Sequence, residues 1–387
     1  MTSDPSQLPT AASRARAFFR RFGHEVAVEL ENDLERISRL FSDDRPDKVV
    51  PLITGFAGYR NQTTARVKAR IIRTPKIRGA PTSTFAKMHA MYRLYNSHEL
   101  PDVPVILEGY GGTYEAVSDE EGYVSFEVVA PPPTDNVTAW ESVTMRLAGE
   151  WASADDDGEV TIPVLRAGTD GNWAVISDID DTIIETGAHN FVKNWRKVLV
   201  DQVEDRLAVP GAPDLYRAIA GNFQTPTRPF FYVSSSPWNL YGFLTSFMER
   251  HEIPHGPMFL KDYGIDADKF IDAAHSDHKL DAIETILGFY PDQTFLLIGD
   301  NGQHDVEIYA QAVADYPGRI GAVYIRDVHG NCADDIKATL FEQIRNAGVK
   351  LWCGSGFDDA VALTQSLGLS KPLEAAKAVE GGEGAGG

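Results

Sequence analysis

Two aspartates follow an apolar run near the middle of the chain. From Val175 to Ile183 the sequence reads Val-Ile-Ser-Asp-Ile-Asp-Asp-Thr-Ile, with Asp178 and Asp180 two residues apart. In extended backbone both side chains point to the same side. The two carboxylates repel each other, and a bound Mg²⁺ would remove this repulsion because it prefers hard oxygen ligands. A single aspartate at this place is more often a turn or capping residue, so the metal hypothesis needs further ligands.

Two more aspartates supply them. The segment from Gly299 to Asp305 reads Gly-Asp-Asn-Gly-Gln-His-Asp, follows a second apolar run and leads into a helical pattern. Such a segment can be a plain turn with a helix N-cap. Its place after a buried strand favours a metal role. We therefore predict a Mg²⁺ site whose ligands come from Asp178, Asp180, Asp300 and Asp305.

Candidates for phosphate binding come from two other segments. Ser234 and Ser235 open the sequence Ser-Ser-Ser-Pro-Trp, and their hydroxyl and N–H groups would bind an anion at a helix N-terminus. Serine and proline also begin helices without binding anything. Lys279 is expected to begin an apolar-periodic helix, where the helix dipole disfavours a cation, so a nearby anion would explain it. A lysine without a ligand remains the alternative.

The elements that must position these residues form an α/β pattern. Short apolar runs end in Asp, Ser or Gly and alternate with helical stretches, which predicts a parallel sheet covered on both faces. Ligands bind at the carboxyl ends of the strands in such sheets. Asp178, Ser234 and Asp300 are therefore expected at one edge. The predicted strands are residues 173–178, 229–234, 257–260, 294–300 and 320–325.

The N-terminal half has a different pattern. Short alternating runs predict an antiparallel β-sandwich-like domain over residues 45–168, with a helix at 84–96 and a hairpin turn at 119–122. Residues 1–44 are predicted to be a helical segment, 169–370 the catalytic domain, and 371–387 a disordered tail. The strands expected before residue 168 are 49–55, 65–72, 103–110, 112–117, 122–129, 141–147 and 158–165.

Composition narrows the choice of partners. The 387 residues carry a net charge of −20, which disfavours nucleic acid as a partner. The two cysteines, Cys332 and Cys353, are too few for a disulfide framework, and no run is long and apolar enough to be a transmembrane segment. We expect a cytoplasmic protein. Peripheral association with a membrane stays open, and its protein partners are unknown.

Four motifs in this order resemble the haloacid dehalogenase (HAD) phosphatase superfamily. They are Asp-x-Asp-x-Thr at Asp178, the serine at Ser234, the lysine at Lys279, and Gly-Asp-x-x-x-x-Asp from Gly299. The surrounding residues, with Val-Tyr-Ile-Arg-Asp-Val from 323 to 328, resemble the catalytic domain of the actin-patch-associated phosphatidate phosphatase family over residues 172–355.

This resemblance implies specific roles. Asp178 would be the nucleophile that forms an aspartyl phosphate, and Asp180 would be the general acid and base. Thr182 would orient the loop, while Ser234 and Lys279 would bind the phosphoryl oxygens. Asp178, the Asp180 carbonyl, Asp300 and Asp305 would hold Mg²⁺. Two residues depart from the family pattern: Asn301 stands where serine is usual, and Glu185 lies where lysine is common.

The function expected from these observations is Mg²⁺-dependent hydrolysis of a phosphomonoester, with phosphatidate implied by the resemblance. No large cap is expected between Thr182 and Ser234, and an open site suits a bulky substrate such as a lipid head group. The alternatives are a HAD phosphatase acting on a phosphoprotein, phosphosugar or polynucleotide end, and a noncatalytic binding module. An inert copy should have lost acidic or lysine positions, and all of them are present.

Overall fold

The computed structural model describes most of the two predicted β-containing regions. The predicted helices at 1–44 and 84–96 and the tail at 371–387 lie outside the described residues. The described residues are 51–73, 99–151, 159–168, 173–185, 208–221, 228–261, 273–328, 330, 332 and 335–369.

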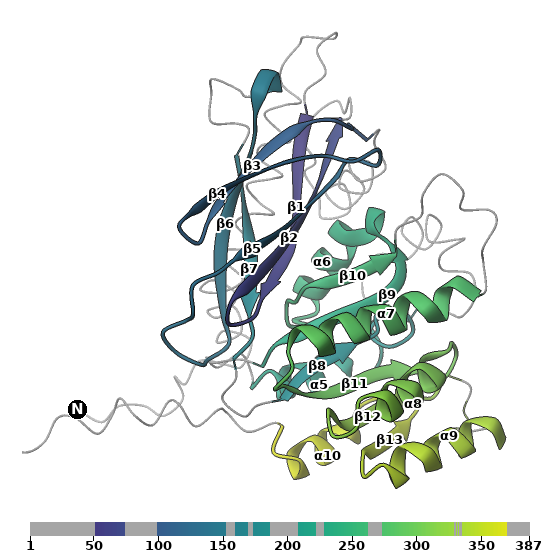
Figure 1. The fold of residues 1–387 in the computed structure, drawn as a ribbon. Coiled ribbons are helices and arrows are strands. Elements are labelled where there is room, and N and C mark those ends of the chain that lie inside the picture. The colour runs from purple at the N-terminus through teal and green to yellow at the C-terminus, as the bar shows by residue number, and fades with distance from the viewer. Residues whose placement is uncertain are drawn as a thin grey trace, which may run out of the picture.

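Seven strands before residue 168 form one sheet (Figure 1). Its order is β4-β3-β6-β7-β1-β2-β5, and every pair is antiparallel except β1 with β7. The strands are β1 (Pro51–Arg60), β2 (Thr64–Arg73), β3 (Pro104–Gly109), β4 (Gly112–Val117), β5 (Tyr123–Val129), β6 (Ala139–Leu147) and β7 (Glu159–Arg166). A short 3₁₀ helix, η2 (Gly149–Trp151), precedes β7.

The seven-stranded sheet encloses a core of its own. Val105 and Met145 from one end of the sheet and Val67 and Phe126 from the other end belong to the same buried cluster. Alternate residues of each strand point inward, as period-two patterning requires. The strands are thus hydrogen-bonded as one sheet, and side chains from both ends of that sheet pack into a single core.

The prediction of a hairpin at 119–122 is wrong, because the strands on either side of the turn do not pair with each other. The turn itself forms: Gly122 N donates to Asp119 O at 2.9 Å, and the Asp119 side chain accepts from Tyr123 N at 2.8 Å. However, β4 pairs with β3 and β5 pairs with β2, at opposite ends of the sheet order. A turn sequence specifies the local reversal of the chain, whereas strand pairing depends on which inward faces share the core.

The second sheet is parallel throughout, with the order β10-β9-β8-β11-β12-β13. This confirms the α/β prediction. Five strands match the predicted runs, and the sixth, β13, was not predicted. The strands are β8 (Trp173–Ser177), β9 (Phe230–Pro237), β10 (Met258–Lys261), β11 (Thr294–Asp300), β12 (Ile320–Arg326) and β13 (Lys350–Gly354).

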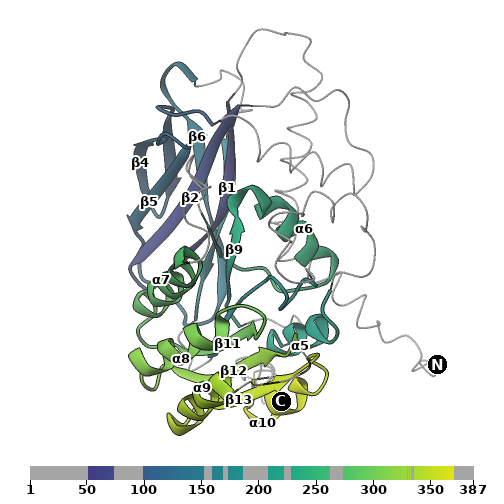
Figure 2. The same ribbon diagram turned by 90° about the vertical axis from the view of Figure 1, so that its right-hand side faces the viewer.

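Helices cover both faces of this sheet (Figure 2). Successive strand residues alternate between two buried clusters; for example, Val175 packs with the helices on one face and Ile176 with those on the other. The first face carries α5 (Ala212–Ile219), α6 (Tyr241–Arg250, after the 3₁₀ helix η4, Trp238–Leu240) and α10 (Ala360–Ser366). The second carries α7 (Ala273–Phe289), α8 (Asp305–Asp315) and α9 (Asp335–Asn346).

Aromatic side chains join the two sheets. Phe56 of β1 lies with its ring centroid 4.3 Å from Trp238 and 4.9 Å from Tyr241, and Ala57 N donates to the Tyr241 hydroxyl at 2.9 Å. Tyr59, also in β1, contacts Phe231, Phe259, Phe289 and Tyr290. The seven-stranded sheet is therefore packed directly on the elements that surround β9.

In the part of the chain that the structure describes, no helix has the length and apolar character needed to cross a membrane. No large cap is predicted between Thr182 and Ser234. Residues 186–207 of this interval lie outside the described residues, so the absence of a cap stays a prediction.

Candidate active site

The order in which the chain adds strands to the parallel sheet reverses next to β8. From β8 the chain first moves outward to β9 and β10, and then returns to place β11 on the other side of β8. Such a switch point leaves a crevice at the carboxyl ends of the two strands. Asp178 directly follows β8 and Asp300 is the last residue of β11, and Asp178 N donates to Ile298 O at 2.8 Å. The topology therefore brings both carboxylates to the same edge of the sheet.

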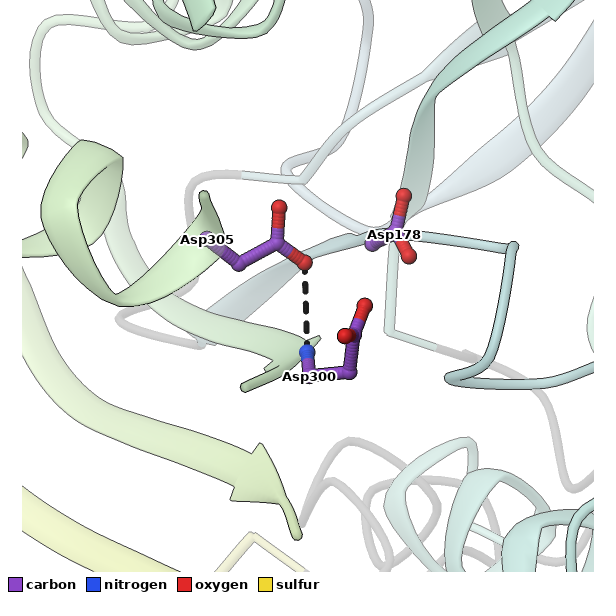
Figure 3. Close-up of side chains that lie close together, drawn as sticks. All are labelled: Asp178, Asp300 and Asp305. Carbon is purple, nitrogen blue, oxygen red and sulfur yellow. Dashed lines mark hydrogen bonds between the residues drawn. The ribbon is translucent and has the colours of Figure 1, made fainter. Parts of the chain in front are cut away.

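Three aspartates converge there, as Figure 3 shows. One carboxylate oxygen from each of Asp178, Asp300 and Asp305 lies within 4.8 Å of the other two, and all three residues are buried. Asp305 begins α8 and turns back toward β11, so that its Oδ2 accepts from Asp300 N at 3.2 Å. The structure brings these three predicted residues together, and their role as metal ligands stays a prediction.

The donor set fits a hard cation. Asp300 Oδ1 accepts from Gly302 N at 2.6 Å and Gln303 N at 3.1 Å, but its other oxygen, Oδ2, is buried without a hydrogen-bond partner among the described residues. Burial and the nearby Asp305 raise the pKa of Asp300 to about 7. A cation would compensate this charge, and hard oxygen ligands suit Mg²⁺. The Asp180 carboxylate does not belong to this group of three and accepts hydrogen bonds from Ser234 and Ser236, so the metal contact predicted for Asp180 remains that of its carbonyl.

Gly299 allows the close approach of α8. A Cβ atom at this position would lie 2.5 Å from Asp305 Oδ2 and 2.7 Å from the Tyr309 hydroxyl oxygen. Real Cβ atoms do not come this close, so any side chain would displace Asp305 or Tyr309. The glycine before Asp300 is thus required by the geometry of the acidic cluster.

Lys279 lies between two of the aspartates. Its Nζ is 2.8 Å from Asp178 Oδ1 and 2.6 Å from Asp305 Oδ1, and the side chain is 4% exposed. Burial opposes the charged form, but Asp178 and Asp305 outweigh it and hold the pKa of Lys279 above its ordinary value. The expectation that Lys279 begins a helix is wrong, since α7 begins at Ala273. The two carboxylates, rather than a ligand at a helix end, account for the lysine.

Thr182 and Lys279 fix the Asp178 carboxylate from two sides. Thr182 Oγ1 donates to Asp178 Oδ2 at 3.1 Å, while Lys279 faces Oδ1. Burial raises the pKa of Asp178 well above its usual range; Lys279 counters this effect, and Asp305 adds to it. The carboxylate is therefore held in one orientation but poorly solvated. Because poor solvation disfavours the charged form, Asp178 is ionised only when a positive charge lies close to it.

Asp180 faces the end of β9. Ser234 Oγ donates to Asp180 Oδ2 at 2.6 Å, and Ser236 Oγ to the same oxygen at 3.1 Å. Burial raises the pKa of Asp180, and these two hydrogen bonds partly oppose the shift. A carboxyl with a raised pKa can hold a proton closer to neutral pH, as a general acid needs.

The serines do not lie at a helix N-terminus as predicted. β9 continues to Pro237, and the 3₁₀ helix η4 that leads into α6 begins only at Trp238, four residues after Ser234. Ser236 was missed as a separate candidate, although it stands two residues after Ser234 and strand periodicity places both side chains on the same side. By the same periodicity the buried Ser235 points to the other side. Its part in substrate binding remains a prediction.

Comparison with known proteins supports the resemblance seen in the motifs. Residues 173–327 match the family described as phosphatidate phosphatase APP1, catalytic domain. Phosphatidate phosphatase APP1 of Saccharomyces cerevisiae is 33% identical over 247 residues, covering 62% of this chain and 40% of that protein. An uncharacterized protein of Schizosaccharomyces pombe is 28% identical over 226 residues, covering 56% and 34%. The chain thus spans less than half the length of either relative.

The alignment with the Saccharomyces cerevisiae protein is longer than the segment 172–355, so the similarity extends beyond the region marked by the motifs. Among solved structures, a carbohydrate acetylesterase from Xanthomonas citri aligns with 77% of this chain and 75% of its own at 12% identity, and its TM-score of 0.26 is too low to bear on the fold. The expected resemblance is confirmed, and the segment that carries the acidic cluster, Lys279 and Ser234 is similar to the catalytic domain of phosphatidate phosphatase APP1.

Proposed function

We propose that this protein is a Mg²⁺-dependent phosphatase that forms an aspartyl phosphate on Asp178 and hydrolyses phosphatidate to diacylglycerol. The observation that carries the proposal is the buried meeting of Asp178, Asp300 and Asp305 with Lys279 at the switch point of the parallel sheet. Similarity to the APP1 catalytic domain supports the reaction class.

Asp178 is the proposed nucleophile. A carboxylate oxygen of Asp178 attacks the phosphorus atom, a new oxygen–phosphorus bond forms, and the bond to the leaving alkoxide breaks. Thr182 and Lys279 hold the carboxylate in one orientation before substrate arrives. This preorganisation reduces the entropic cost of bringing nucleophile and phosphorus together.

Asp180 is the proposed proton carrier. In the first step it gives its proton to the leaving oxygen, and in the second it accepts a proton from the water that attacks phosphorus and releases inorganic phosphate from Asp178. Its hydrogen bonds to Ser234 and Ser236 hold the carboxyl beside β9, apart from the acidic cluster. The two acids therefore have different hydrogen-bond partners, Thr182 for Asp178 and the serines of β9 for Asp180, and they have different proposed tasks.

Asp178, Asp300, Asp305 and the Asp180 carbonyl are proposed to hold Mg²⁺, which when bound offsets the negative charge of the carboxylates and the phosphate. Lys279 adds a second positive charge next to the nucleophile. Ser234 is proposed to bind a phosphoryl oxygen, which requires its hydroxyl to turn from Asp180 toward the substrate.

A measurement of phosphate release tests the proposed reaction. We expect purified protein to release phosphate from phosphatidate in mixed micelles or vesicles when Mg²⁺ is present and not when EDTA is present. Asp178→Asn should reduce the rate by at least about 10⁴-fold because no other group replaces the nucleophile. Asp292→Asn, at an exposed loop position, is the matched control and should retain the rate of the unaltered protein.

A panel of soluble phosphomonoesters, phosphosugars and phosphopeptides, tested beside phosphatidate, identifies the substrate class. Preference for a soluble compound would retain the phosphatase proposal and reject phosphatidate. Full activity of Asp178→Asn would reject the aspartyl-phosphate mechanism itself.

A further inference from the structure

Arg326 contacts the loop that carries Asp178 and Asp180. It is the last residue of β12, and its guanidinium donates to Asp181 O at 2.7 Å and to Glu185 Oε1 at 3.0 Å. The Arg326 side chain is 11% exposed and that of Glu185 is 42% exposed. An arginine with two forked contacts of this kind fixes the position of its partners as well as their charge.

The partner of Arg326 is a strained point of the loop. Asp181 has φ of +56°, in the left-handed region that residues other than glycine seldom adopt. It stands between Asp180 and Thr182, the residue whose hydroxyl holds Asp178. Such a conformation persists when surrounding contacts enforce it. The hydrogen bond from Arg326 to the Asp181 carbonyl is one of these contacts.

The residues after Arg326 hold the second acidic loop. Asn301, next to Asp300, donates from its backbone N to Arg326 O at 3.0 Å and from Nδ2 to Asp327 Oδ1 at 2.8 Å. Asn301 Oδ1 accepts from Val328 N at 2.8 Å. The segment 326–328 therefore binds both loops of the site.

Glu185 and Asn301 both contact this segment. Glu185 pairs with Arg326, and Asn301 bridges Asp327 and Val328. A lysine at 185 would place a second cation beside Arg326. Glutamate instead neutralises the guanidinium and leaves it directed at the Asp181 carbonyl.

We propose that Arg326 is a positioning residue for the phosphatase reaction, and that Glu185 holds it against the Asp181 carbonyl so that Asp178 and Asp180 keep their working orientation. This inference rests on the function proposed above. A partly exposed ion pair adds little to folding stability. The main effect of the pair is therefore on geometry, where a displacement of about 1 Å can cost about 100-fold in rate.

The test uses the full chain with Mg²⁺ and a soluble phosphomonoester, p-nitrophenyl phosphate, beside phosphatidate. Arg326→Met should lower kcat by about 10- to 100-fold while KM changes less than about threefold, because Ser234 and Lys279 remain to bind phosphate. Arg326→Lys should recover part of kcat, since an ammonium can still donate to the Asp181 carbonyl. Arg345→Met, at an exposed helix position, is the matched control.

Glu185→Gln tests the coupling. It should lower kcat by a smaller factor, about threefold to tenfold, and the double variant Arg326→Met with Glu185→Gln should be no slower than Arg326→Met alone, because the two residues act as one unit. Melting temperatures within about 3 °C of the unaltered protein would exclude general unfolding as the cause. If Arg326→Met does not fold, Arg326→Lys and Glu185→Gln carry the same test.

Three results are distinguishable. An unaltered protein without phosphatase activity refutes the proposed function. Active protein whose Arg326→Met variant keeps kcat within about twofold refutes the positioning role alone. If the losses of kcat in the two single variants multiply in the double variant, the two residues act independently, and the proposed dependence of Arg326 on Glu185 is refuted.

Discussion

Ser234 Oγ donates a hydrogen bond to Asp180 Oδ2 at 2.6 Å, and Ser236 supports the same carboxylate from two residues further along β9. The proposed general acid is thus held by the strand next to the one that carries it. This arrangement couples the proton affinity of Asp180 to two hydroxyl groups.

Ser236→Ala should change the pH dependence of the reaction. The lost hydrogen bond stabilised ionised Asp180, so its pKa should rise further from its already raised value. The protonated acid is needed for departure of the leaving group, so the basic limb of kcat/KM should move to higher pH, by about 0.5–1 unit. Steady-state rates across pH 5 to 9 measure this shift.

The control for that experiment is Ser366→Ala, which removes an exposed hydroxyl from the end of α10. Its pH profile should match that of the unaltered protein. An unchanged limb in Ser236→Ala would show that the limb does not report Asp180.

Lys279→Met should impair both catalysis and folding. It removes the ammonium that lies between Asp178 and Asp305 and leaves two buried carboxylates without it. We expect kcat to fall by about 10²- to 10³-fold and, without added metal, the free energy of unfolding to fall by about 3–5 kcal/mol at neutral pH. Urea denaturation and phosphate release measure the two effects.

Lys350→Met provides the comparison, because Lys350 is exposed on β13. It should leave both quantities unchanged. A kcat for Lys279→Met near that of Lys350→Met would remove Lys279 from the mechanism.

Asp300→Asn should stabilise the metal-free protein at high pH. The folded-state pKa of about 7 lies above the ordinary value of 3.8, so the folded form holds a proton that the unfolded form releases. Stability contributed by the protonated group is complete below about pH 4 and is lost as pH rises toward 7. In EDTA at pH 8 the variant should therefore gain roughly 1–3 kcal/mol, with little gain at pH 4.

Mg²⁺ should reverse the ranking at pH 8. Millimolar Mg²⁺ is expected to raise the melting temperature of the unaltered protein more than that of Asp300→Asn, since binding to the folded form adds stability. Equal shifts in the two proteins would place the metal elsewhere. Asp292→Asn is again the exposed control.

Phe56→Ala tests the junction of the two sheets. Phe56 is 2% exposed and packs on Trp238 and Tyr241, directly after the serines of β9. The truncation should lower the free energy of unfolding by about 3–5 kcal/mol. Val129→Ala, which is 76% exposed, should change it by less than about 0.5 kcal/mol. Urea denaturation of both variants makes the comparison, and equal stabilities would mean that the junction contributes nothing.

Sequence patterns were sufficient for every described strand except β13 and for the meeting of Asp178, Asp300 and Asp305. Apolar runs that end in acidic residues specify parallel strands, and parallel strands share one carboxyl edge. Local patterns failed where tertiary contacts decide. The start of α7 at Ala273 was missed because apolar periodicity begins only near Lys279, and the strand pairing around residues 119–122 depends on the shared core.

The contacts that side chains make at the strand ends could also not be predicted from the sequence. The role of Arg326 depends on which carbonyl its guanidinium meets, and residues 181 and 326 are far apart in the chain. Ser236, in contrast, was within reach, since period-two spacing from Ser234 is a local property.

The aromatic junction around Phe56 and Tyr59 has a thermodynamic consequence. Because β1 supplies side chains both to its own sheet and to the cover of β9, loss of either sheet exposes the same rings to water. Heating should then produce a single calorimetric transition, with equal van't Hoff and calorimetric enthalpies, instead of two separate melting events.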